Sequence, residues 1–217
     1  MSRWTTGVCE TNGIDMHYLR TGGAKPPLVL LHGLIGNGAC WTPVARALED
    51  DYDVVMPDAR GHGQSSAPLH GYRYDDHASD VIGLIHSLRL VSPIVVGHSM
   101  GGMTAAVVAG RMGDGLRGVI LVDPTFLSPE RQREVCDSDV AEQHRRLLSL
   151  NKGELLAQLR SRHGRRSPEM VELLVEARRQ TRLSAFDVLT PPNPPYRELV
   201  RAIEVPILLA IGDDPVV

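Results

Sequence analysis

The sequence predicts an α/β protein with a mostly parallel, doubly wound sheet, and three observations predict this class. Short apolar runs that suit strands buried on both faces recur along the chain. Segments with helical spacing of apolar residues separate these runs. Glycine-rich loops follow several of the runs, and in such sheets ligands bind beyond the carboxyl ends of the strands.

The chain begins with a predicted hairpin. Residues 4–9 and 14–19 read as strands on either side of Asn12 and Gly13. Both turn residues tolerate positive φ, which a two-residue hairpin turn requires.

Buried strands and helices alternate after the hairpin. The apolar runs that predict strands are residues 28–31, 52–56, 94–96, 119–122 and 206–211. The helices predicted between them cover residues 41–48, 78–88 and 102–111. In the second helix, Ala78, Val81 and Ile85 fall at positions i, i+3 and i+7, so one apolar face packs on the sheet.

Residues 125–204 differ in character from the rest of the chain. They carry a net charge of +2, whereas the remainder carries −5. Helical patterns cover residues 140–150, 152–160 and 168–183, before a proline-rich break at 191–195. We expect a helical cap inserted after the strand that ends near Val122. The predicted domains are residues 1–124 (N-terminal part of the core), 125–204 (cap) and 205–217 (C-terminal part of the core).

Composition excludes several functional classes. The 217 residues are 42% hydrophobic and carry a net charge of −3, so no basic field recruits nucleic acid. Three scattered cysteines form neither a disulfide framework nor a metal-binding pattern. No signal core and no run long enough to span a bilayer is present. We therefore expect a cytoplasmic protein with no membrane span, metal or organic cofactor.

The pentapeptide GHSMG at residues 97–101 fits the pattern G-x-S-x-G. A nucleophile on a tight strand-to-helix turn needs glycine on each side, because a side chain there would clash with neighbouring backbone. The pattern predicts Ser99 as a nucleophile whose following helix offers amide donors to a developing oxyanion. The simpler alternative is that Ser99 caps the helix.

With four further motifs, the chain resembles the α/β-hydrolase superfamily, in particular its capped members with a serine nucleophile. The motifs, in the family's order, are HG at 32–33, DARGHGQS at 58–65, GHSMGG at 97–102, LVDP at 121–124 and VPILLAIGDDP at 205–215. They span nearly the whole chain.

The resemblance implies a role for each matching residue. Ser99 is the nucleophile, and the backbone N–H groups of Leu34 and Met100 form the oxyanion hole. His98 and Leu34 line the substrate pocket. His32 orients its loop rather than taking part in the chemistry.

The acid of the implied triad has more than one candidate. Asp214 matches the family position after the penultimate strand, and Asp213 lies next to it. Asp123 is the runner-up, because some relatives place the acid after the earlier strand.

The chain departs from the family at the general base. The triad order in this fold is Ser, acid, His, and all nine histidines precede Asp214. His144 and His163 lie in the cap and are expected to be solvated. We therefore expect that the last strand, its helix and the catalytic His are missing, and that the 217-residue chain is essentially inactive.

The resemblance implies a hydrolase for a small carboxylic ester-like substrate (ester, lactone or thioester), acting through an acyl-Ser99 intermediate. The partner is a small-molecule acyl substrate. One alternative is a catalytically incomplete, hydrolase-like binding protein. Another is a relative of the C–C bond hydrolases or cofactor-free haloperoxidases.

Overall fold

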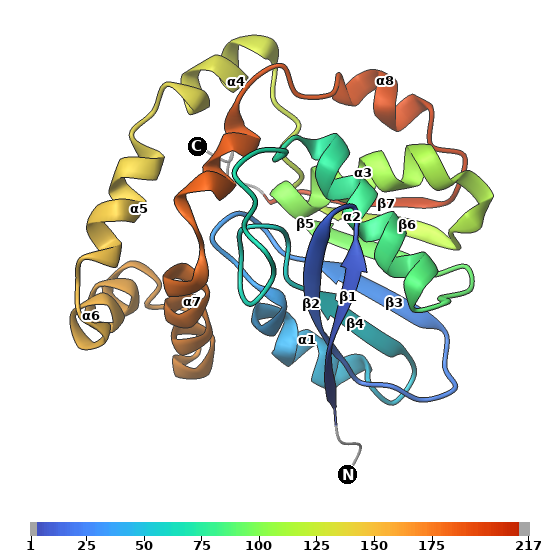
Figure 1. Cartoon of the computed structure of the whole chain (residues 1–217), viewed down its shortest axis with the longest axis horizontal. Coiled ribbons are helices and arrows are strands. Elements are labelled where there is room, and N and C mark those ends of the chain that lie inside the picture. The colour runs from blue at the N-terminus through green and yellow to red at the C-terminus, as the bar shows by residue number, and fades with distance from the viewer. Residues whose placement is uncertain (1–3, 213–217) are drawn as a thin grey trace.

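The computed structural model describes residues 4–212, which form one seven-stranded sheet in the order β1-β2-β4-β3-β5-β6-β7 (Figure 1). The strands are β1 (Thr5–Thr11), β2 (Ile14–Arg20), β3 (Pro27–Leu31), β4 (Asp53–Pro57), β5 (Ile94–His98), β6 (Gly118–Val122) and β7 (Ile207–Ala210). β2 pairs antiparallel with β1 and β4, and every other pair is parallel. The predicted mostly parallel sheet is therefore confirmed.

Eight α-helices accompany the strands in the described residues: α1 (Thr42–Leu48), α2 (Tyr74–Ser87), α3 (Met100–Met112), α4 (Pro129–Cys136), α5 (Val140–Leu148), α6 (Lys152–Arg162), α7 (Pro168–Gln180) and α8 (Tyr196–Arg201). Three 3₁₀ segments are η1 (Gly38–Trp41), η2 (Gly113–Gly115) and η3 (Leu183–Leu189). The sequence patterns did not predict α4 or α8.

The hairpin turn has the predicted geometry. Asn12 and Gly13 adopt φ values of 44° and 74°, and Thr11 pairs with Ile14 across the turn. Positive φ at both central residues suits the right-handed twist of the strands, so this local signal correctly placed the first two strands.

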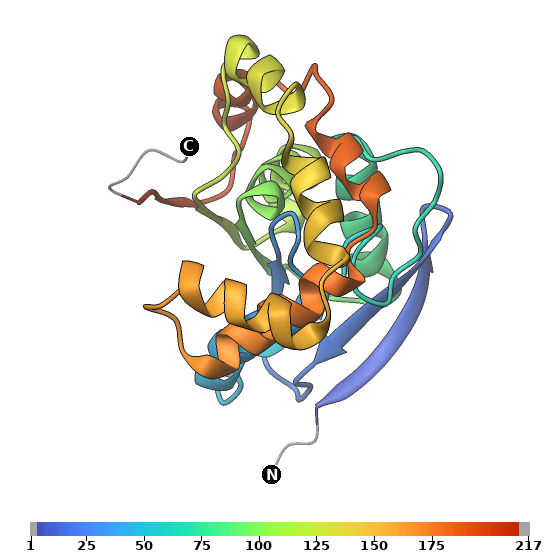
Figure 2. The same cartoon turned by 90° about the vertical axis from the view of Figure 1, so that its left-hand side faces the viewer.

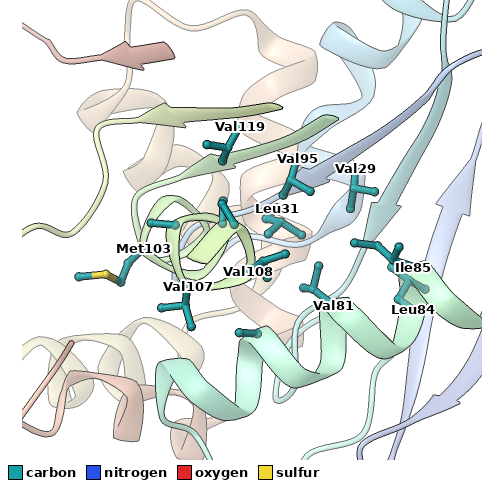
Figure 3. Packing of buried hydrophobic residues seen from close by; sticks show 14 of the residues in the cluster. Val29, Leu31, Val81, Leu84, Ile85, Val95, Met103, Val107, Val108 and Val119 are labelled. Atoms are coloured by element: carbon teal, nitrogen blue, oxygen red, sulfur yellow. The ribbon is translucent and has the colours of Figure 1, made fainter. Parts of the chain in front are cut away.

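Helices cover both faces of the sheet, as a doubly wound fold requires. On one face, side chains such as Leu31 and Val95 pack against Val81 of α2 and Met103 of α3 (Figure 3). On the other face, a smaller apolar cluster includes Ala45 of α1. The α3 helix consists mainly of small residues that are buried, so its backbone packs close to the strands.

The chain reverses its direction of travel across the sheet between β3 and β5. β4 lies on one side of β3, whereas β5 and β6 follow on the other. The connections that follow β3 and β5 therefore run toward opposite sides of the sheet, and doubly wound sheets bind ligands at such a point, beyond the carboxyl ends of the strands. A Cβ built on Gly33 would lie 3.2 Å from the Cβ of Ser99, so the two loops are in contact.

Helices α5, α6 and α7 lie over this edge, in front of the strands in Figure 2. Leu155 and Leu159 of α6 pack against Val171 and Val175 of α7. The end of α7 is joined to the core by a 2.9 Å hydrogen bond from Asn37 Nδ2 to Gln180 Oε1.

Helix α8 packs against α3 of the core, away from helices α5, α6 and α7. A Cβ at Gly110 of α3 would lie 3.2 Å from Leu199 Cδ1, and Tyr196 and Leu199 contact the main apolar core. The predicted cap of residues 125–204 therefore includes a helix that packs with the core, and the domain boundaries stay a prediction.

Strand β7 is the last described element, and Ile207, Leu208 and Leu209 are exposed on it. The expected absence of a further strand and helix stays a prediction. Within residues 4–212, no helix is both long and apolar enough to cross a bilayer.

Candidate active site

Ser99 occupies a strained turn between β5 and α3. Its φ and ψ are 54° and −117°, a combination that residues with a side chain rarely adopt. Backbone hydrogen bonds hold the turn: Ser99 N–H donates to O of Val122 in β6 at 3.0 Å, and Ser99 O accepts from Gly102 N–H at 2.9 Å. Strain held in place by surrounding structure is typical of functional sites.

The glycines around Ser99 are required by close backbone contacts. A Cβ on Gly97 would overlap the carbonyl oxygen of Gly101. A Cβ on Gly101 would overlap the carbonyl oxygen of Leu31 and lie 2.6 Å from that of His32. The spacing G-x-S-x-G is thus explained by steric exclusion on both sides of the turn.

Ser99 borders a cavity of about 460 Å³ between the core and the cap helices. His98 and Leu34, the two predicted pocket residues, line the same cavity. Its wall is mostly apolar, with Trp41 from the core and Leu159 and Leu174 from the cap. Such a space suits a small organic ligand with an apolar body.

Two buried histidines hold the loop that faces Ser99. Ala59 N–H donates to His32 Nε2 at 2.9 Å, so His32 Nδ1 carries the proton and donates to Gly33 O at 2.8 Å. Ile35 N–H donates to His62 Nε2 at 3.3 Å, and Ile35 has a φ of 67°. The loop conformation is therefore fixed by the side chain of its first residue, His32, and by His62 from the turn after β4.

Both histidines are held in their neutral form. Burial lowers the pKa of His32, and burial together with the neighbouring His32 ring lowers that of His62 well below its ordinary value. A neutral ring donates from one nitrogen and accepts at the other, which is what each of these contacts needs. His32 thus orients its loop in the way the resemblance implied.

The backbone N–H groups of Leu34 and Met100 have no acceptor in the part of the chain that the structure describes. Met100 is the first residue of α3, where N–H groups have no partner within the helix. Leu34 lies in the loop that touches Ser99 through Gly33. The oxyanion hole stays a prediction, and these two donors are free to form it.

Asp123 lies at the end of β6, beside the end of β7. Its N–H donates to Ala210 O at 2.8 Å, and its Oδ1 accepts from Gly212 N–H at 2.7 Å. Asp213 and Asp214 lie outside the described residues, so the assignment of the acid to Asp214 stays a prediction.

No histidine among residues 4–212 forms a hydrogen bond with the Ser99 hydroxyl. The expectation that His144 is solvated is wrong: it is fully buried, and its ring lies 5.0 Å from that of Phe186. His163 is half-buried and lines the cavity. His144 of α5 thus packs against Phe186 of η3, the segment that follows α7, and the sequence pattern alone did not reveal this contact.

Leu159 and four further cavity-lining cap residues were not predicted, and the four are Arg166, Met170, Leu174 and Arg178. They follow one another at four-residue intervals, the spacing that places residues of a helix on one face. That spacing could have indicated from the sequence that these residues share one face of a helix. What the sequence could not supply was which face of α7 turns toward the core.

The sequence is similar to those of known hydrolases. It is 36% identical over 107 residues to a 2-(acetamidomethylene)succinate hydrolase of Mesorhizobium japonicum, and the aligned residues cover 49% of this chain and 38% of that protein. It is 37% identical over 127 residues to an N-formylmaleamate deformylase of Pseudomonas putida, covering 58% and 47% respectively. The chain thus spans less than half the length of these two relatives.

The fold also matches solved structures. An enol-lactonase from Burkholderia xenovorans superposes with a TM-score of 0.76 and 26% identity, over 95% of this chain and 81% of that one. The sequence profile of the α/β-hydrolase fold family matches residues 26–216. This match extends over most of the chain, and the observed sheet and serine turn agree with it. The chain therefore belongs to the α/β-hydrolase fold family.

Proposed function

We propose that the protein is a serine hydrolase that cleaves a small carboxylic ester-like substrate (ester, lactone or thioester) through an acyl-Ser99 intermediate. The observation that carries the proposal is the strained turn at Ser99, which borders the cavity beside two backbone N–H groups that have no acceptor within residues 4–212. The likeness to hydrolases, and to an enol-lactonase in fold, supports the same chemistry.

In the proposed reaction, Ser99 Oγ attacks the acyl carbon and loses its proton. The negative charge that develops on the carbonyl oxygen is stabilised by the N–H groups of Leu34 and Met100. The leaving group departs with a proton, and water then releases the acid and restores the hydroxyl. Asp214 is the proposed acid of the triad, with Asp213 and Asp123 as the alternatives.

The Ser99 proton needs a base. A serine hydroxyl without an adjacent base is a weak nucleophile at neutral pH, and no histidine of residues 4–212 forms a hydrogen bond with it. We therefore expect slow acylation in the 217-residue chain. Added imidazole is expected to accelerate it by serving as the base within the open cavity.

Labelling with a fluorophosphonate tests this proposal. We expect adduct on Ser99, mapped by peptide mass spectrometry, with a rate that rises at least about ten-fold in imidazole. Ser99→Ala is expected to abolish the adduct. Ser65, a serine of the loop after β4, serves as the internal comparison and is expected to stay unlabelled.

The same experiment separates the binding-protein alternative. That alternative is favoured by the absence of a histidine at the Ser99 hydroxyl within residues 4–212. It predicts no Ser99 adduct at any imidazole concentration in a chain that still binds small molecules in the cavity. That outcome would contradict the hydrolase proposal.

A further inference from the structure

Two arginines from the cap line the same cavity as Ser99. Arg166 precedes α7, and Arg178 lies in the last turn of that helix. Among the described residues, the cavity wall holds no aspartate or glutamate. The positive charge at this site therefore has no negative counterpart in the wall.

Arg178 is held in place by a neutral group. His144 Nε2 donates to Thr181 O at 3.1 Å, which leaves His144 Nδ1 as an acceptor, and Arg178 Nη1 lies 3.5 Å from it. No carboxylate within residues 4–212 forms an ion pair with Arg178 or Arg166. Since a guanidinium has five donors, most of those of Arg178 are left for another partner.

Two other arginines that are largely withdrawn from solvent, Arg60 and Arg20, each have a carboxylate partner. Arg60, whose side chain is 4% exposed, donates to both carboxylate oxygens of Asp80 at 2.6 and 2.5 Å. Arg20 likewise pairs with Asp53, through Nε at 3.0 Å from each oxygen. A charge withdrawn from water is costly without a counter-ion. Half-buried Arg178 has no such carboxylate partner among residues 4–212.

Further positive charge lies close to Arg178. Burial lowers the pKa of Arg178, and the charge of Arg162 lowers it further. Burial lowers the pKa of His98, next to Ser99; the carboxylate of Asp123 at the end of β6 raises it, and the charge of Arg166 lowers it. An anion bound among these groups would relieve their mutual repulsion, and the exposed Arg162 and Arg165 would draw it toward the cavity.

We propose that Arg178 and Arg166 form a subsite for a carboxylate of the substrate, whose apolar portion lies against Trp41 and Leu174. The preferred substrates are then acyl compounds that carry a second, anionic carboxylate. This specificity rests on the proposed function, because it assumes that the bound molecule presents its acyl group to Ser99. Binding of the anion itself requires no reaction.

Calorimetric titration of the 217-residue chain with hexanoate and with its neutral isostere hexanamide tests the subsite. We expect hexanoate to bind about ten-fold more tightly, as a charge-assisted hydrogen-bonded pair provides. The preference is expected to fall to about one in Arg178→Gln and to decrease in Arg166→Gln. The exposed Arg179 of the same helix gives the matched control, and Arg179→Gln is expected to keep the preference.

Thermal unfolding of each variant shows whether it is folded, and Arg166 is exposed, so its replacement leaves packing intact. Equal binding of the two probes, binding of neither, or a preference that survives in Arg166→Gln/Arg178→Gln would overturn the subsite. Ser99→Ala is expected to keep the preference. A Ser99 adduct without the preference would leave the proposed function standing, whereas the preference without an adduct would leave only the subsite.

Discussion

At the scale of single residues, the site depends on glycines, which have no Cβ atom. Gly97 and Gly101 let the backbone of the serine turn approach its neighbours more closely than any Cβ permits. Ser99 itself keeps a backbone conformation that is unfavourable for a residue with a side chain. The turn therefore exists only because the residues on both sides of Ser99 make room for it.

Gly101→Ala tests this requirement. The added Cβ would overlap Leu31 O, so we expect a loss of about 1–3 kcal/mol in the free energy of unfolding, measured with urea. Labelling of Ser99 should fall with it. The control is Gly164→Ala, whose Cβ would meet nothing closer than Arg160 O at 3.8 Å and should change stability by less than about 0.5 kcal/mol. Equal stability of the two variants would contradict the steric account.

At the scale of elements, the turn after β4 supports the loops around the cavity. The buried Asp58 carboxylate accepts from Gly38 N–H at 2.7 Å, from Gln64 N–H at 2.9 Å and from His17 Nδ1 at 2.8 Å. Burial raises the pKa of Asp58, and these hydrogen bonds outweigh burial, so the pKa is lowered overall. One carboxylate thus ties β2, η1 and this turn together.

Replacing Asp58 by Ala leaves these three donors without an acceptor. We expect Asp58→Ala to lose about 3–5 kcal/mol of unfolding free energy in urea titrations at pH 7. The matched control is Asp15→Ala, since Asp15 is an exposed residue of β2, and its change should stay within about 0.5 kcal/mol. A loss below about 1 kcal/mol for Asp58→Ala would show that water replaces the carboxylate.

The elements that the sequence predicted are those whose signals are local. The Asn12-Gly13 turn and the apolar runs located all seven strands, because turn chemistry and burial on both faces leave marks in short windows. Helix α8 has six residues, too few to display a helical period. Helix α4 carried an unused signal, Ser128 before Pro129, and the Ser128 hydroxyl accepts from Arg131 N–H at 3.3 Å.

The candidate site likewise contains features that the sequence predicted and side chains that it did not. The turn at Ser99 was predictable because its flanking glycines reflect geometry within five residues. The positions of Arg178 and the buried His144 were not, because both depend on how α7 and η3 dock on the rest of the chain. Only the tertiary structure shows which side chains a cap turns toward the sheet.

At the scale of the whole molecule, a set of buried neutral histidines couples folding to pH. Burial lowers the pKa values of His32 and His62, and lowers that of His77 to about 3. In the unfolded chain these rings titrate near their ordinary value of about 6.5. Below that pH the unfolded state binds protons that the folded state does not, so stability falls as the pH falls.

We expect the free energy of unfolding to decrease steadily between pH 6.5 and pH 5. His77 alone contributes about 1.4 kcal/mol per pH unit once its unfolded ring is mostly protonated. His77→Gln should remove that part of the slope, whereas His70→Gln, at an exposed position, should leave the slope unchanged. Urea titrations at several pH values measure it, and an identical slope in both variants would refute the coupling.

The central claim is that Ser99 is an acylated nucleophile in a cavity shared by core and cap. Its most direct test is mass spectrometry of the chain during incubation with p-nitrophenyl butyrate and imidazole. We predict a transient butyryl group on the peptide that contains Ser99, absent from Ser99→Ala. The absence of a Ser99 adduct while p-nitrophenol is released equally by the chain and by Ser99→Ala would contradict the claim.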